Sequence, residues 1–196
     1  MILPIVAYGD PVLKKKAKEI DKDYPKLSEL LDNMFETMYN ASGVGLAAPQ
    51  IGLPIRLFIV DAEPFSEDDE LSDEESEKLR GFKKVFINAT ILEETGEEWA
   101  FSEGCLSIPD IREDVFRNEI VKIKYFDENF VEHTETYDGL AARVIQHEYD
   151  HIEGILFTDK LSSLKKRLIK GKLANISKGK INSDYRMRFP MAKKAR

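Results

Sequence analysis

Two histidines four residues apart give the first sign of chemistry in this sequence. His147 and His151 enclose Glu148 in the segment QHEYDH, residues 146–151, and the chain holds only three histidines. On a helix, residues four apart project from nearly the same face, so both imidazoles can reach one point. Glu148 projects close enough to reach a group bound there. This HExxH spacing predicts a metal site with a general base beside it.

A third ligand is needed, because a catalytic metal ion usually has three protein ligands and one open position. After the second histidine there is no further histidine, and the only acids are Glu153, Asp159 and Asp184. The single cysteine, Cys105, lies upstream in EGCLSIP, residues 103–109. A lone cysteine is usually buried filler, but the glycine and proline here can present its thiol away from a strand. We favour Cys105, and thiolate with imidazole suits zinc, ferrous iron or nickel.

The histidines need a helix, and the sequence predicts one over residues 138–153. Asp138 is suited to cap its start, and Gly154 follows its end. A second, amphipathic helix is predicted over residues 25–40, where apolar side chains recur at helical spacing. A third, basic helix is expected over residues 157–172.

β-Branched and aromatic residues mark the segments that are expected to form strands. These segments are residues 55–61, 84–92, 121–126 and 130–136. Polar residues 127–129 between the last two predict a hairpin, whereas residues 42–54 are too rich in Gly and Pro for regular structure. Strands that flank the motif helix without regular alternation predict an α+β fold, with antiparallel or mixed sheets packed around the HExxH-bearing helix.

Length and composition limit the chain to one sizeable core. The 196 residues are 42% hydrophobic, which is enough for one domain. We expect a single catalytic domain over residues 1–172, with an exposed acidic insertion at about residues 63–81, where like charges are too dense to form a core. Residues 173–196 are expected to form a basic, loosely ordered C-terminal tail.

Charge is distributed unevenly along the chain. The net charge is −7, yet residues 160–196 contain thirteen Lys or Arg and one acid. Such asymmetry is typical either of a tail that seeks an anionic partner or of a solvated basic helix. The first residues do not resemble a signal peptide, and no window approaches the roughly 18 apolar residues of a membrane span. We expect a cytoplasmic protein without membrane or DNA partners.

Three separated segments together resemble the signature set of the peptide deformylase family. They are GVGLAAPQIG (43–52), EGCLSIP (103–109) and QHEYDH (146–151), in the same order and at comparable separations. The opening GDPVLKKKAKEI and the segment DGLAARVIQ also agree, so the resemblance covers roughly residues 1–160. It implies an α+β fold around the motif helix. It also implies removal of the N-formyl group from nascent polypeptides that begin with formylmethionine.

The resemblance implies a metal centre with assigned ligands. Cys105, His147 and His151 would hold one divalent ion per chain, with ferrous iron as the natural metal and zinc, nickel or cobalt as substitutes. Glu148 would take a proton from water and deliver it to the departing amine. The same three ligands accept several ions, so the sequence does not identify the metal.

The resemblance also implies how the substrate is held. The Gln50 side-chain amide and the backbone N–H of Leu106 would donate hydrogen bonds to the oxyanion, and backbone groups of Gly45 would contact the peptide. The residues expected to line the methionine pocket are Val44, Leu140 and Val144. Arg143 occupies a neighbouring position that some members fill with an apolar residue, and its stem can line a wall while its guanidinium reaches water.

Two further contacts are expected around this centre. Glu103 can orient a ligand or pair with Arg112 or Arg117. The basic run KKRLIKGK, residues 165–172, can contact ribosomal RNA through phosphate neutralisation.

Two other functions fit the HExxH motif. An endopeptidase would use the same site to cut internal peptide bonds. A non-catalytic protein would bind a structural metal, with His133 or an acid closing the fourth position. Otherwise His133 is expected to be a surface or strand histidine.

Overall fold

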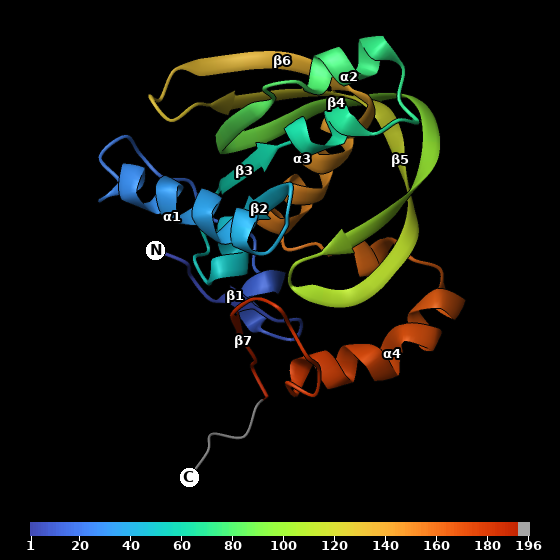
Figure 1. Cartoon of the computed structure of the whole chain (residues 1–196). Helices are drawn as coiled ribbons and strands as arrows, with labels where there is room; N and C mark the ends of the chain where they lie inside the picture. The colour runs from blue at the N-terminus through green and yellow to red at the C-terminus, as the bar shows by residue number, and fades with distance from the viewer. Residues whose placement is uncertain (192–196) are drawn as a thin grey trace.

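Five strands pair side by side in the order β2-β3-β4-β5-β6, and every neighbouring pair is antiparallel (Figure 1). The computed structural model describes residues 1–191. The strands are β2 Gly45–Ala47, β3 Leu57–Asp61, β4 Lys83–Cys105, β5 Ile108–Phe126 and β6 Glu132–Asp138. With the helices packed on this sheet, the predicted α+β fold is confirmed.

The motif helix α3, Gly139–Ile152, lies at the centre of the fold and packs against β2, β3, β5 and β6. Every residue from Ala141 to Ile152 except Tyr149 is buried, so even its polar side chains must find partners inside the protein. The predicted helix is confirmed. Asp138 occupies the N-cap position but makes no capping hydrogen bond, because its carboxylate pairs with Lys78 at 3.1 Å.

The amphipathic helix α1, Leu27–Asn40, is also confirmed. Leu31, Met34 and Met38 are buried at helical spacing, and the helix covers β2 and β3. This packing fixes the position of β2, which follows α1 in the chain and borders the motif helix.

The long pair β4 and β5 extends far beyond the predicted strands at 84–92 and 121–126. Residues 92–98 are exposed, so no buried face imposes the alternation by which a strand is recognised in a sequence. Register shifts interrupt the pairing at several points, and such bulges bend a strand pair. The curved pair carries Glu103 and Cys105 back to the motif helix.

Two shorter segments also differ from the prediction. Residues 42–54 contain β2 and a 3-10 helix, η2 Ala48–Ile51, instead of irregular structure. Pro49 suits the start of that helix, and Gly52 follows it at φ 87°. The hairpin at 127–129 is confirmed, but its second strand begins at Glu132 instead of residue 130.

The acidic insertion lies on the surface beside β4 and β6 (Figure 1). It forms a 3-10 helix, η3 Glu63–Glu67, and the short helix α2, Asp73–Leu79, more regular structure than expected. Ser72 caps α2 through a reciprocal bond with Glu75. Most of its side chains are exposed, as predicted.

The C-terminal part of the chain packs against the body. A 3-10 helix, η4 Phe157–Lys160, precedes the helix α4, Ser163–Ser177, so the expected helix over 157–172 starts later and ends later. Beyond it, β7 Met187–Arg188 pairs in parallel with β1 Ile5–Val6. The expectation of a loosely ordered tail is therefore corrected as far as Met191, because apolar side chains of this segment are buried in the core. Residues 192–196 lie outside the described part of the chain.

Within residues 1–191, no helix combines the length and the apolar character that crossing a bilayer requires.

Candidate active site

Three metal-ligating side chains converge where β4 meets α3. Cys105 ends β4, and His147 and His151 lie one turn apart on α3. One ligand atom of each residue lies within 4.8 Å of the others, and Cys105 Sγ is 3.4 Å from His151 Nε2. Among the described residues this is the one group of this kind. The structure thus brings together side chains that are more than forty residues apart in the sequence.

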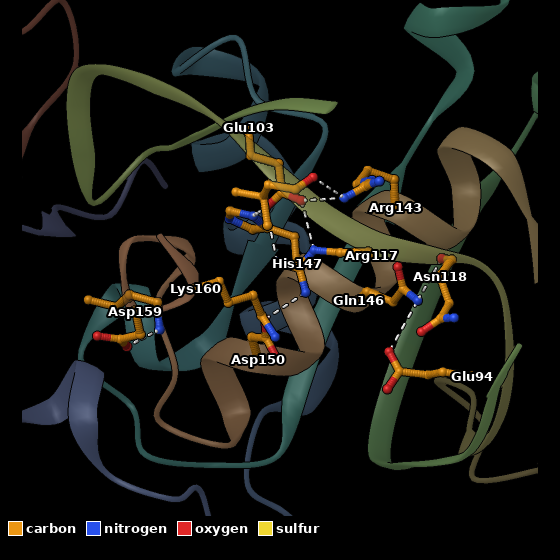
Figure 2. A network of polar contacts seen from close by, with 12 residues as sticks. Glu94, Glu103, Arg117, Asn118, Arg143, Gln146, His147, Asp150, Asp159 and Lys160 are labelled. Atoms are coloured by element: carbon orange, nitrogen blue, oxygen red, sulfur yellow. Dashed lines mark hydrogen bonds and ion pairs between the residues drawn. The ribbon is translucent and has the colours of Figure 1, made fainter. Parts of the chain in front are cut away.

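A buried carboxylate orients the first histidine. Glu103 accepts a hydrogen bond from Nδ1 of His147 at 2.9 Å (Figure 2). Arg117 holds both oxygens of Glu103, at 2.7 and 3.0 Å, and reaches Asp150 at 2.7 Å. This confirms the expected partner of Glu103 as Arg117, whereas Arg112 donates to the backbone oxygen of Ser102.

The charges around His147 favour a positive charge on or next to its imidazole ring. Burial alone would raise the pKa of Glu103, but hydrogen bonds from His147 and Arg117 outweigh it and hold that pKa well below its usual range. Burial would lower the pKa of His147, yet bonds to Cys105 and Glu103 and the charge of Glu148 raise it well above its usual value. A potential that favours a proton on this imidazole also favours a metal ion.

The donor set fits a transition metal ion. Nδ1 of His147 donates to Glu103, so its Nε2 is the atom that can bind a metal ion. This arrangement is common at metal sites. A thiolate with two imidazoles suits zinc, iron, cobalt or nickel. Three protein ligands leave one position for water or substrate, as a catalytic site requires.

Glu148 lies beside this group and is 4% exposed. Its buried Oε2 has no hydrogen-bond partner among residues 1–191. Burial raises its pKa to about 7, which suits a group that accepts and returns a proton near neutral pH. Its side chain packs on Gly45, where an added Cβ would lie 2.5 Å from Oε1. Glycine at this position therefore makes room for the carboxylate.

Gln50 directs its amide nitrogen at the thiolate. Its Oε1 accepts a bond from the backbone N–H of Ala47 at 2.8 Å, which fixes the orientation of the amide group. Nε2 then lies 3.5 Å from Cys105 Sγ and 3.5 Å from Ser107 Oγ. Leu106 follows the cysteine directly and borders the same space. Two potential hydrogen-bond donors, the Gln50 amide and the Leu106 backbone N–H, thus lie near the three potential metal ligands.

A cavity of about 510 Å³ opens onto these residues. Val44, Gly45 and Val144, the residues expected to contact the substrate, line it. Leu140 shares a face of α3 with Val144 but lies one turn nearer the start of the helix, where it packs against the core and does not line the cavity. Further apolar residues on the wall include Phe65, Phe101, Ile108 and Ile111.

The guanidinium of Arg143 does not reach water, contrary to expectation. The residue is 2% exposed, and its guanidinium donates to Glu103 at 3.0 Å (Figure 2). It also donates to the backbone oxygen of Trp99 at 2.7 Å. It also lies 4.4 Å from the centre of the Trp99 ring, a favourable cation–π distance. Buried acceptors hold the charge inside the protein while Arg143 borders the cavity.

The competing ligands are engaged elsewhere. His133 lies 2.8 Å from Asp127 on the β5–β6 hairpin. Glu153 pairs with Arg56, and Asp159 pairs with Lys14. The structure offers no support for a site that His133 or one of these acids closes.

Among the residues of the site that the sequence did not single out, three come from unexpected parts of the chain or complete its ion pairs. Phe65 comes from the acidic insertion and Tyr185 from the expected tail, and both line the cavity. Asp150 completes the bonds of Arg117. Only Tyr185 left a signal, because it alternates with Met187 and Phe189 in a strand-like pattern.

Comparison with known proteins agrees with this geometry. A family described as Polypeptide deformylase matches residues 2–167. A peptide deformylase of Christiangramia forsetii is 75% identical over 196 residues, which is all of both chains. A peptide deformylase of Flavobacterium psychrophilum is 68% identical over 96% of this chain and 97% of that protein.

Solved structures show the same similarity in three dimensions. The peptide deformylase of Legionella pneumophila has a TM-score of 0.76 at 37% identity, covering 92% of this chain and 98% of that one. A peptide deformylase of Plasmodium falciparum has a TM-score of 0.75 at 34% identity, covering 88% and 94%.

Proposed function

This chain belongs to the peptide deformylase family, and we propose that Cys105, His147 and His151 hold the metal ion with which it removes N-formyl groups. The family acts on nascent polypeptides that begin with formylmethionine and releases formate. The observation that supports this assignment is the convergence of the three ligands beside Glu148 at the cavity.

Held by Cys105, His147 and His151, the ion would supply Lewis-acid chemistry for the formyl oxygen and would lower the pKa of a water molecule from 15.7 towards about 7. Glu148 accepts the proton of that water through its unpaired oxygen. It then returns the proton to the amine nitrogen as the C–N bond breaks. The Gln50 amide and the Leu106 N–H stabilise the oxyanion that develops on the formyl oxygen.

The methionine side chain enters the cavity between Val44 and Val144. β2 is an edge strand, so its free edge can pair with an extended peptide, and Gly45 supplies backbone groups for that contact. Leu140 is not included, because it lies off the cavity wall.

Formate release from formyl-Met-Ala-Ser by anaerobically prepared protein tests this function. We expect turnover with internal peptide bonds left intact, and we expect Cys105→Ala to lose both bound metal and activity. Cleavage of internal bonds, or a Cys105→Ala variant that retains metal and turnover, would contradict the assignment.

Ferrous iron is the ion that we propose for the site. Iron bound to a thiolate is open to oxidation of both metal and sulfur. Protein loaded with iron should therefore lose activity in air, while protein loaded with nickel or cobalt should keep it. Equal stability of the three forms in air would count against iron.

The enzyme is proposed to act in the cytoplasm, where translating ribosomes present its substrate. Exposed basic residues of α4, including Lys166, Arg167 and Lys170, support a contact with ribosomal RNA. Reversing these three charges should weaken co-sedimentation with ribosomes at low salt, whereas reversing Lys22, Lys26 and Lys122 should not. Equal binding by both variants would remove this part of the proposal.

A further inference from the structure

The turn after Cys105 lacks the geometry that usually stabilises a short hairpin. Cys105 pairs with Ile108, which leaves Leu106 and Ser107 as a two-residue turn. Two-residue turns that suit the twist of a hairpin need positive φ at their first residue, and neither Leu106 nor Ser107 has positive φ. The register also shifts between Gly104 and Cys105. Other contacts must therefore hold this turn.

Both ends of the chain supply those contacts. The Tyr185 hydroxyl donates to the backbone oxygen of Leu106 at 2.7 Å. The backbone N–H of Tyr8 donates to the backbone oxygen of Ser107 at 2.8 Å. The Leu106 oxygen belongs to the central peptide of the turn, so the bond from Tyr185 fixes the orientation of that peptide.

The segment that carries Tyr185 is itself anchored. The backbone N–H of Ile5 donates to the backbone oxygen of Arg186, and the backbone N–H of Ala7 donates to the backbone oxygen of Arg188, each at 2.9 Å. The Arg188 guanidinium lies against Gly52, where an added Cβ would be 2.8 Å from Nη2. Through β1 and β7, the chain ends hold the turn from outside the β4–β5 pair.

We propose that Tyr185 is a positioning residue for the deformylation reaction. Its hydroxyl holds the Leu106 turn so that the Leu106 N–H faces the developing oxyanion. Tyr185 and Leu106 both line the cavity. This inference rests on the proposed role of Leu106. Oxyanion donors act through preorganised geometry, and a displacement of about 1 Å is enough to reduce the rate substantially.

Tyr185→Phe tests the proposal because it removes the hydroxyl and keeps the ring. We expect kcat for formyl-Met-Ala-Ser to fall about tenfold, with KM within about twofold of the wild-type value. Tyr24→Phe is the matched control, since its hydroxyl makes no hydrogen bond among the described residues and Tyr24 lies outside the cavity. It should leave both constants unchanged.

A second measurement does not depend on turnover. In zinc-loaded protein without substrate, the Leu106 amide of Tyr185→Phe should shift in the ¹⁵N–¹H spectrum and exchange faster with solvent, while distant amides stay in place. An unchanged kcat, an unchanged Leu106 amide, or shifts spread through the whole spectrum would overturn the proposal. If the wild-type protein released no formate, the proposed function would fail, and the amide measurement would still decide whether Tyr185 holds the turn.

Discussion

At the scale of single residues, Glu103 connects the metal ligands to the rest of the protein. Its carboxylate is 3% exposed and accepts bonds from Arg117, Arg143 and His147. Buried charged groups need a partner of opposite charge, and Glu103 is that partner for these donors. The orientation of His147 therefore depends on Glu103, which is not one of the three proposed ligands.

We predict that Glu103→Gln weakens metal binding about 10- to 100-fold. The neutral amide of glutamine replaces the charged carboxylate that accepts from His147 and orients its ring. Stability should also fall by about 3–5 kcal/mol, since the buried guanidinium of Arg143 loses its counter-charge and that of Arg117 keeps only Asp150. Competition with a chelator measures the first effect, and urea unfolding measures the second. Glu98→Gln, on an exposed part of the same strand, should change neither.

We predict that Glu148→Gln lowers kcat by about 10²–10⁴, the usual contribution of a general base. The substitution is nearly isosteric, so its packing against Gly45 is preserved. Metal content should stay near the wild-type value, because Glu148 is not one of the ligands. Metal analysis beside the formate assay checks this, and joint loss of metal and activity would contradict the assigned role.

At the scale of secondary structure, the acidic insertion takes part in the site through one side chain. Its charged residues are solvated, but Phe65 on η3 turns inward, packs against the core and lines the cavity. The insertion is too highly charged to form a core of its own, yet it adds apolar surface to the wall of the cavity.

We predict that Phe65→Ala raises KM for formyl-Met-Ala-Ser about tenfold with a smaller change in kcat, because it removes apolar contact from the wall and not from the reacting atoms. Steady-state kinetics measure both constants. Phe116→Ala is the control, since Phe116 is 64% exposed and does not line the cavity. A similar KM for both variants would place Phe65 outside the substrate contact.

The β5–β6 hairpin contains a carboxylate that responds to pH. Burial raises the pKa of Glu135, but hydrogen bonds from Tyr125, Tyr137 and Lys84 outweigh it, so the pKa lies below its usual value. The folded state thus binds this proton less readily than the unfolded chain. Its contribution to stability is present above the unfolded pKa and is lost as pH falls through the folded pKa.

Glu135→Gln should therefore reduce the loss of unfolding free energy between neutral and acidic pH. Urea titrations at a series of pH values measure this dependence. Glu132→Gln, a half-exposed carboxylate on the same strand, is the comparison. An identical pH dependence in the wild-type protein and Glu135→Gln would exclude this role.

At the scale of the whole molecule, the C-terminal segment is part of the folded body. Ile169, Leu173 and Ile176 of α4 are buried in a cluster with Leu13 and Phe157. The boundary expected at residue 172 falls inside this helix. A single catalytic domain therefore has to include the segment that carries Tyr185.

We predict that Ile176→Ala lowers the free energy of unfolding by about 2–5 kcal/mol, because it leaves a cavity in this cluster. Leu168→Ala, on the same helix but 72% exposed, should change it by less than about 0.5 kcal/mol. Urea unfolding followed by fluorescence and by circular dichroism should give one shared transition for each variant. Separate transitions would show that α4 unfolds independently.

Local sequence was sufficient for the motif helix, α1, β3 and the β5–β6 hairpin, because each carries its own periodicity or turn chemistry. It was insufficient for the outer part of β4, where exposure on both faces removes the pattern. It was also insufficient for the first part of β5, where charged side chains separate the few buried apolar ones. It also misplaced the end of the domain, because a basic helix with few apolar residues does not reveal which of them are buried.

The sequence by itself was enough to propose the chemical groups of the site: one thiol, two imidazoles and a carboxylate, with a spacing that a helix brings to one face. Only the tertiary structure decided which residues surround them. Phe65, Arg143 and Tyr185 reach the cavity through contacts between distant segments. The physical reason is that side-chain chemistry and helical spacing are local properties, whereas burial and hydrogen-bond pairing depend on which parts of the chain meet after folding.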